Sequence, residues 1–396
     1  MLNVTGHDMP GVTSALFSCL PESMTIIDVE QVVVQGLLTL AVLVEVSAGV
    51  DVDHVVEHVS NNLKGMGIQV SSVIADNYVE VQNGNYLTIT VLGGPLVASA
   101  MSQLAAQIAG TGANIDRIQR IAAYPVTALE LTISGGDKAV LRKELAALSH
   151  VSGIDIAVYH GGIDRRGRQL VVMDVDSTVI QDEVVELLAA HAGAQTEVKR
   201  ITEAAMAGEL DFEESLRARV ALLKGLPESI FENVFKELRL TPGARTLCRV
   251  LKSLDYHVAL VSGGFTQVVE PLGKLLDVDH IRANELEVVD GFLTGRLVGE
   301  IVDRAGKAEA LIHFAQMHGI PLSRTIAIGD GANDLDMLAA AGLGIAFNAK
   351  PVVRNAADTA VNVPYLDTVL YLLGITRQEI EDFDLQNGFD TSYPSV

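Results

Sequence analysis

The chain of 396 residues has no tryptophan, only two cysteines, and aromatic residues at 5% of its length. Cys19 and Cys248 stand far apart and offer no disulfide framework, which is typical of a reducing compartment. The longest apolar run, Leu37–Val44, is too short to span a bilayer. The N-terminus has neither the basic nor the apolar segment of a secretory signal. These absences predict a cytoplasmic protein.

Basic residues are also scarce. The chain has 28 lysines and arginines against 50 aspartates and glutamates, which gives a net charge of −22. Such a chain is repelled by phosphate backbones and by anionic membranes, so we expect neither nucleic acid nor membrane as a partner. The length and the hydrophobic share of 49% suffice for two or three packed domains.

The most informative segment is the apolar run Leu170–Met173, which ends in the sequence D-V-D-S-T. A short run of this kind is typical of a buried parallel strand. Asp174 and Asp176 stand at its end, and in extended backbone residues i and i+2 point to the same side. Crowded carboxylates need compensation, which a divalent cation would provide. The alternative is a strand-to-loop corner in which both residues serve the turn.

Two more apolar segments end in polar groups. Val258–Ser262 runs into Gly263 and Gly264, and Thr325–Gly329 runs into the sequence D-G-A-N-D. Lys307 stands between them at the start of a helical pattern. Ligands of open α/β sheets bind at the carboxyl ends of the strands, so these groups are expected at one edge. Each motif alone would be an ordinary turn, whereas the ordered set favours a site.

The motifs D-V-D-S-T, S-G-G-F, the isolated lysine and G-D-G-A-N-D resemble the four motifs of the haloacid dehalogenase superfamily. Within it, residues 168 to 373 resemble the phosphoserine phosphatase family. The resemblance implies an α/β fold, a Rossmann-like parallel sheet with a helical cap. It also implies Mg²⁺-dependent hydrolysis of O-phospho-L-serine, the last step of serine biosynthesis, through an aspartyl-phosphate.

The resemblance also implies roles for individual residues. Asp174 would be the nucleophile, and Asp176 the general acid and then the general base. Mg²⁺ would be held by Asp174, the main-chain carbonyl of Asp176, and Asp330, with Asp334 supporting these ligands from behind. The phosphoryl oxygens and the substrate would be held by Ser262, Gly263, Lys307 and Asn333.

The segment 182–238 between the first two motifs has a largely helical pattern and resembles the cap of this family. By resemblance its substrate contacts fall on Glu183, Met206, Phe212 and Arg219. Arg219 would bind a carboxylate and Glu183 an ammonium group, while the two apolar residues close over a short carbon skeleton. Without the resemblance, these residues would be read as cap core and as a solvated arginine.

The first 160 residues predict two copies of a ferredoxin-like βαββαβ unit, and we place domains at residues 1–80, 81–162 and 163–396. The turn from Gly6 through Asp8 to Gly11 resembles the signature of ACT domains, which often bind amino acids and pair side by side. It implies an amino-acid effector, such as serine, and a homodimer. The second copy lacks the Asp–Pro–Gly portion. A dimerisation module that binds nothing is the alternative.

Other functions remain open at this point. One alternative is a phosphatase for another small phosphate, and another is an amino-acid-binding regulator whose phosphatase half is idle. A dehalogenase is disfavoured because that reaction needs no metal. The H-x-x-E-H pattern at His54–His58 is expected to be a surface feature of a helix and no zinc site. Asp290 and Gly291 predict a hairpin turn beside the sheet, and the tail beyond Thr376 is expected to be mobile.

Overall fold

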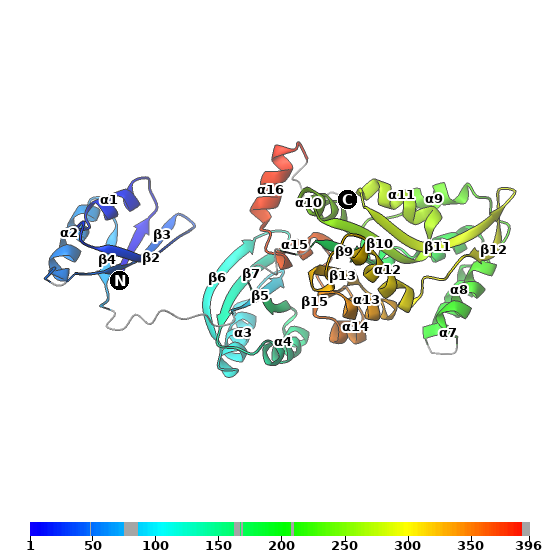
Figure 1. Cartoon of the computed structure of the whole chain (residues 1–396), viewed down its shortest axis with the longest axis horizontal. Coiled ribbons are helices and arrows are strands. Elements are labelled where there is room, and N and C mark those ends of the chain that lie inside the picture. Colours follow the sequence, from blue (N-terminus) through cyan, green and yellow to red (C-terminus); the bar gives the residue numbers. More distant parts are fainter. Residues whose placement is uncertain (48, 75–85, 162–166, 168, 207–209, 390–396) are drawn as a thin grey trace. The chain divides into compact units, whose positions relative to one another are not determined.

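The computed structural model describes residues 1–47, 49–74, 86–161, 167, 169–206 and 210–389 (Figure 1). The chain divides into two compact units, Met1–Gln82 and Asn83–Val396. The first unit contains one four-stranded sheet, and the second contains a four-stranded and a seven-stranded sheet. The domain boundaries predicted at residues 80 and 162 fall outside the described residues.

The first unit has the βαββαβ order, with its sheet in the order β2-β3-β1-β4. Its apolar core lies between the sheet and the two helices, because helix α2 turns Val55, Val59 and Leu63 inward at a helical spacing. The polar residues of the H-x-x-E-H pattern are exposed on the opposite side of α2. The elements are β1 (Leu2–His7), α1 (Val12–Ser18), β2 (Thr25–Val34), β3 (Leu37–Glu45), α2 (Val52–Lys64) and β4 (Gln69–Ser72).

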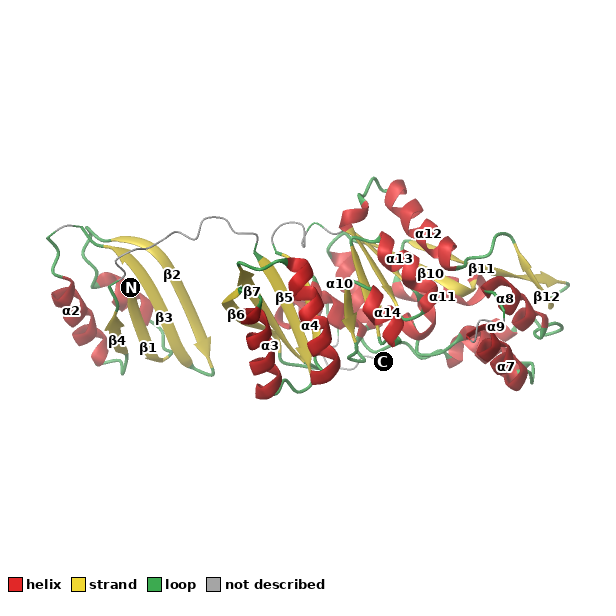
Figure 2. Cartoon of the chain, turned by 90° about the horizontal axis from the view of Figure 1, so that it is seen from below, coloured by secondary structure: helices red, strands yellow, loops and turns green. Residues whose placement is uncertain are grey.

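The second unit begins with another βαββαβ domain, whose sheet has the order β6-β7-β5-β8. Helices α3 and α4 cover one face of this sheet (Figure 2). The other face contributes Leu92, Ala128 and Ala157 to the core of the following domain, so the two share one apolar interior. The elements are β5 (Leu87–Gly93), α3 (Ala98–Gly110), β6 (Asn114–Ala122), β7 (Thr127–Ser134), α4 (Lys138–Ser152) and β8 (Asp155–His160).

The seven-stranded sheet has the order β12-β11-β10-β9-β13-β14-β15. All neighbouring pairs are parallel except β11 with β12. Strand β9 is central, and its last residue Met173 is in register with Leu260 and Ile328 on either side. The strands are β9 (Leu170–Met173), β10 (His257–Phe265), β11 (His280–Val289), β12 (Phe292–Val298), β13 (Thr325–Gly329), β14 (Leu343–Phe347) and β15 (Thr359–Val361).

Helices cover both faces of this sheet, as expected where parallel strands are buried on both sides. One face packs against α12 (Arg304–Met317), α13 (Leu335–Ala340) and α14 (Pro351–Ala356). The other packs against α10 (Ala244–Ser253), α11 (Thr266–Leu276) and α15 (Val369–Leu372). The predicted α/β fold class is confirmed, and both faces of β9 are closed to water.

The insert after β9 is helical, in line with its pattern. It consists of α6 (Val184–His191), α7 (Gln195–Met206), α8 (Phe212–Ala221) and α9 (Ile230–Glu237). The two ends of the insert meet in an antiparallel bridge between Ile180 and Leu240. The hairpin turn at Asp290–Gly291 joins β11 to β12, which extends the sheet by one strand.

The expectation of a mobile tail beyond Thr376 is wrong for its described part. Residues Arg377–Gln386 form helix α16, which begins with a reciprocal capping box between Thr376 and Glu379. The bidentate pair of Arg249 with the buried Asp384 fixes α16 to α10. Among the described residues, no helix is long and apolar enough to cross a membrane.

Candidate active site

Strand β9 delivers Asp174 to the carboxyl edge of the sheet. The backbone N–H of Asp174 still donates to Ile328 O at 2.9 Å, so the residue is held by the sheet ladder. The chain then leaves the strand through a tight turn over Val175–Val179, in which Ser177 has a left-handed φ of 57°. This turn places Asp176 beside the cap, where its Oδ1 accepts from Val184 N at 3.2 Å.

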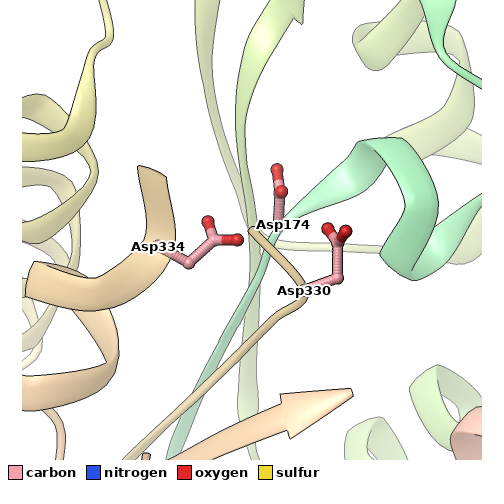
Figure 3. A group of neighbouring side chains, drawn as sticks. All are labelled: Asp174, Asp330 and Asp334. Atoms are coloured by element: carbon pink, nitrogen blue, oxygen red, sulfur yellow. The ribbon is translucent and has the colours of Figure 1, made fainter. Parts of the chain in front are cut away.

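Three carboxylates converge at this edge. Asp174, Asp330 and Asp334 each offer an oxygen within 4.8 Å of the others (Figure 3). Asp330 follows β13, the neighbour of β9, and Asp334 lies in the turn after it. Asp334 Oδ2 accepts from Gly331 N at 2.9 Å, which folds the D-G-A-N-D turn back on itself. Oxygen donors in this arrangement suit a hard divalent cation.

Lys307 is the cation that the carboxylates share. Its Nζ lies 2.7 Å from an oxygen of Asp174 and 2.7 Å from an oxygen of Asp334, and it is fully buried. Burial alone would lower the pKa of Lys307, but these two carboxylates raise it above its usual value. Lys307 therefore stays protonated and compensates only part of the negative charge around it.

The negative charge that Lys307 does not compensate contributes to raised pKa values of the aspartates at this edge. Burial, and next the nearby Asp334, raise the pKa of Asp174, and Lys307 opposes them. Burial and then Glu183 raise the pKa of Asp176 to about 8. Burial and then Asp334 raise the pKa of Asp330 to about 7. One ammonium group is too little for this cluster, so its residues fit a divalent metal ion.

The S-G-G segment lies at the end of β10, next to β9. Ser262 is fully buried and its Oγ accepts from Gly264 N at 2.7 Å. A Cβ on Gly264 would lie 2.9 Å from that Oγ and 3.0 Å from an oxygen of Asp176, so only glycine fits. The buried Asn284 donates to Gly263 O at 2.9 Å and accepts from Val302 N at 2.8 Å, which ties this segment to the one before α12.

A cavity of about 520 Å³ lies between this edge and the cap. Helix α8 contributes Phe212, Ser215 and Arg219, which a helix places on one face. The Phe212 ring covers Gly263, because a Cβ there would lie 3.2 Å from it. Of the predicted site residues, the cavity is lined by Asp174, Asp176, Glu183, Phe212, Arg219, Gly263, Asp330 and Asn333.

The cap residues carry opposite charges into this cavity. Burial lowers the pKa of Arg219, while the carboxylates of Glu183 and Asp176 oppose the shift. Its Nε donates to Ser215 O at 3.3 Å, which leaves the outer nitrogens for another partner. Glu183 accepts from Ser177 Oγ at 2.9 Å, and the surrounding protein raises the pKa of Glu183. The cavity wall thus carries a guanidinium, which is able to bind a carboxylate, and a carboxyl group, which is able to bind an ammonium group.

The structure separates other predicted residues from the cavity wall. Ser262, Lys307 and Asp334 are fully buried at the same edge of the sheet. Met206 is the last residue of α7, and its side chain lies outside the described part. In the first unit, Gly6 lies in β1, and Gly11 begins α1 with a φ of 98°. A cavity in that unit is lined by other residues, and Asp8 is exposed.

The cavity also has walls that the sequence did not suggest. Ser215 is buried, and its Oγ has no hydrogen-bond partner in the described part of the chain. Its position three residues after Phe212 and four before Arg219 is the helical spacing that could have revealed it. Thr202 and Lys350 line the same cavity. They stand outside the four motifs, so no local pattern marked them.

The fold and the site define a haloacid dehalogenase-like hydrolase. Residues 171–339 match the haloacid dehalogenase-like hydrolase family, and residues 1–72 and 87–159 each match an ACT domain family. A solved haloacid dehalogenase family hydrolase from Salmonella enterica is 28% identical, with a TM-score of 0.65 over 72% of this chain and 98% of its own.

The particular family follows from relatives that match nearly the whole chain. The phosphoserine phosphatase of Streptomyces coelicolor is 56% identical over 97% of this chain and 94% of its own. That of Mycobacterium tuberculosis is 50% identical over 97% and 95%. The solved probable phosphoserine phosphatase of Vibrio cholerae is 34% identical, with a TM-score of 0.60 over 77% and 90%. The chain belongs to the phosphoserine phosphatase family.

Proposed function

We propose that this chain hydrolyses O-phospho-L-serine to L-serine and inorganic phosphate through an aspartyl-phosphate on Asp174. One observation carries the proposal. Asp174 and Asp176 form one wall of a cavity whose cap side presents Arg219 and Glu183. A nucleophile and an acid therefore face a pair of opposite charges, as a phosphorylated zwitterion requires.

The cap residues orient such a substrate. The guanidinium of Arg219 binds the α-carboxylate, because its planar donors match a carboxylate bidentately. Glu183 pairs with the α-ammonium group, and the hydroxyl of Ser215 supplies a further polar contact in the same wall. The Phe212 ring over Gly263 excludes water from the carbon skeleton.

The carboxylate cluster is the proposed Mg²⁺ site. Asp174, Asp330 and the main-chain carbonyl of Asp176 would be its ligands, and Asp334 would position Asp174 and Asp330 through Lys307 and Gly331. When bound, the ion supplies positive charge that keeps Asp174 ionised and offsets charge on the phosphoryl oxygens. The raised pKa values of Asp174 and Asp330 support this role, because they indicate that Lys307 offsets only part of the local negative charge.

In the first half of the reaction, an oxygen of Asp174 attacks phosphorus as the bond to the serine oxygen breaks. Asp176 gives its proton to that departing oxygen, and a pKa of about 8 keeps it protonated at neutral pH. In the second half, ionised Asp176 removes a proton from water, which attacks phosphorus and releases phosphate from Asp174. Lys307 and Ser262 hold the phosphoryl oxygens from behind.

The decisive measurement is phosphate release from O-phospho-L-serine, O-phospho-L-threonine and O-phosphoethanolamine, each with Mg²⁺ and with EDTA. We expect fast, metal-dependent release from phosphoserine and weak release from phosphoethanolamine, which lacks the carboxylate. Activity only on a different small phosphate would retain the nucleophile and discard the assigned cap contacts. No release from any phosphate ester would favour an idle phosphatase half.

We further propose that the first ACT domain binds an amino-acid effector, such as serine, at the turn from Gly6 to Gly11. Gly11 begins α1 with a left-handed φ, and among the described residues no side chain caps the first N–H groups of that helix, which supports the turn as the candidate site. Calorimetry of the full chain with L-serine, comparing Asp8→Ala with Asp53→Ala, tests this. Loss of a binding event in the Asp8 variant alone is expected, and equal binding in both would overturn the assignment.

A homodimer through the first ACT domain completes the proposal. Strand β2 is an edge strand that is exposed along its whole length, and it presents Ile26, Val29 and Val33 to solvent. Apolar edge strands of this kind pair readily with another chain. Light scattering should give a dimer for the natural chain and a monomer for Val29→Lys/Val33→Lys. A dimer in both would place the interface elsewhere.

A further inference from the structure

A second polar cavity lies where the second ACT domain meets the phosphatase domain, within the second unit. It measures about 720 Å³ and is walled by α4 and β8 on one side and by α14 and β15 on the other. Hydrogen bonds connect its two walls. The buried Asp155 of β8 accepts from Asn362 N and Nδ2 at 2.6 Å each and from Val363 N at 3.2 Å. These bonds hold the two walls together.

The charge of this cavity is opposite to that of the chain. Although the chain carries −22, the cavity is lined by Lys138, Arg142, Lys143 and Arg354 against two aspartates. The carboxylates of both aspartates already accept hydrogen bonds from other groups. Asp137 accepts from Ala139 N and Val140 N at the start of α4, and Asp358 accepts from Arg142 and Gly344 N.

Two of the four cations, Lys138 and Lys143, stay unpaired in the described part of the chain. Arg142 is paired with Asp358 at 2.8 Å. Arg354 donates from Nη1 to Asn362 Oδ1 at 3.4 Å and interacts with the carboxylate of Asp155, whereas its buried Nε has no hydrogen-bond acceptor among the described residues. A buried guanidinium nitrogen without an acceptor is costly, and an anion in the cavity would relieve that cost.

Helix α14 connects this cavity to the active site. Lys350, which precedes α14, lines the active-site cavity, and Arg354 and Asn355 in the same helix line the junction cavity. The helix has only six residues and packs through the buried Val353. Because so short a helix moves as one rigid body, a shift at its C-terminal end also displaces its N-terminal end. The two cavities therefore share one short rigid element.

We propose that the junction cavity binds a small anion with a carboxylate or phosphate group, and that its occupation alters turnover through α14 and Lys350. The apolar residues Leu87, Ile156 and Val158 in the wall suit a ligand with a short carbon chain. The binding step stands independently, whereas its effect on turnover rests on the proposed phosphatase function.

Calorimetry on the full chain tests the binding step, with succinate as the carboxylate probe and inorganic phosphate as the phosphate probe. We expect one site per chain for at least one probe, with affinity at least tenfold weaker in Lys138→Met/Lys143→Met and in Arg354→Met. Lys274→Met, which removes an exposed lysine of α11, is the matched control and should bind as the natural chain does. Phosphate that binds at the catalytic site instead would be unaffected by the double variant.

Two results overturn the proposal. One is no heat of binding from either probe, and the other is equal binding to the natural chain and to the double variant. Because Arg354→Met could disturb the domain junction, the double lysine variant at the accessible end of α4 provides the decisive comparison. Calorimetry without substrate does not depend on turnover, so it remains interpretable if the phosphatase proposal fails.

The connection to the active site is tested by turnover of O-phospho-L-serine at saturating probe. We expect kcat to change at least twofold in the natural chain and in Lys274→Met, and to stay unchanged in the double variant, because phosphate bound as product at the catalytic site changes KM alone. A probe that binds the junction without changing turnover would overturn the role of α14.

Discussion

The Nζ of Lys307 lies 2.7 Å from an oxygen of Asp174, although the two residues come from different motifs and are both buried. A buried ion pair gains little over an apolar pair of the same size, but removing one partner leaves an uncompensated charge. This pair therefore serves the reaction more than the stability of the fold. In the proposed mechanism it holds Asp174 in place, and the Lys307 ammonium offsets only part of the burial that raises the pKa of Asp174.

Replacing Lys307 tests this pair directly. We expect Lys307→Met to lower phosphatase kcat by at least a thousandfold and to reduce the free energy of unfolding by about 3–5 kcal/mol, because Asp174 and Asp334 lose their counter-charge. Urea unfolding and steady-state kinetics measure both effects. Lys236→Met, at an exposed position of α9, should change neither. A Lys307 variant with natural activity would contradict the assigned role.

The pKa shifts predict how the stability of the metal-free chain depends on pH. The pKa values of Asp176 and Asp330 are raised to about 8 and about 7, above the value of about 3.9 for an unfolded aspartate. The folded state therefore retains protons that the unfolded state has lost. The free energy of unfolding decreases with rising pH wherever the folded state binds more protons than the unfolded state. It should therefore decrease as pH rises from about 4 to about 8.

Urea unfolding in EDTA between pH 5 and pH 9 measures this dependence. The Asp176→Asn/Asp330→Asn variant should show a flatter profile, because the two groups no longer ionise. Mg²⁺ should restore stability most strongly at the alkaline end, where the carboxylates are free to bind it. Stability that rises with pH in EDTA would refute the assigned shifts.

Arg219 should determine substrate choice and not the chemistry. We expect Arg219→Ala to lower kcat/KM for O-phospho-L-serine by a hundredfold or more and to leave p-nitrophenyl phosphate within about threefold. The physical reason is that only phosphoserine has a carboxylate for the guanidinium to bind. Arg217→Ala is a matched control on the same helix, because Arg217 is exposed and pairs with Glu213. Equal losses on both substrates would mean that Arg219 does not contact the carboxylate.

Asn284 should act at a distance by positioning the S-G-G segment. Its side chain bonds Gly263 O and Val302 N, so Asn284→Ala leaves both groups unpaired in a buried place. We expect a loss of about 1–3 kcal/mol in unfolding free energy and a fall in kcat of about tenfold with KM nearly unchanged. Asn233→Ala, at an exposed site of α9, should be neutral. A lowered stability with natural kcat would make Asn284 purely structural.

Much of the site could be predicted because its residues follow strands. Asp174, Ser262 and Asp330 each come at the end of an apolar run, and parallel neighbours bring such ends to one edge. The sequence also contains a signal for the helix in the tail. Thr376 and Glu379 have the spacing of a capping box, which indicates a helix, whereas the polar composition beyond them is typical of a mobile tail.

Other features depend on contacts between distant segments. No local pattern relates Ser215 to Asp176, or Lys350 to Arg219, because these residues meet only when the cap and the loop before α14 close on one cavity. The junction cavity is of the same kind. Its cations come from two domains, and their shared surroundings exist only after β8 has packed against β15.

The sequence by itself determined the elements, the parallel sheet and the chemical groups at its edge. Hydrophobic periodicity, the residues that begin and end helices and strands, and the alternation of strands and helices are local properties. They suffice to predict these elements and the sheet. Tertiary structure alone decided the charge balance, namely which carboxylates share Lys307 and how far burial raises the pKa of Asp176. These properties depend on burial and on distances across the fold, which no single segment specifies.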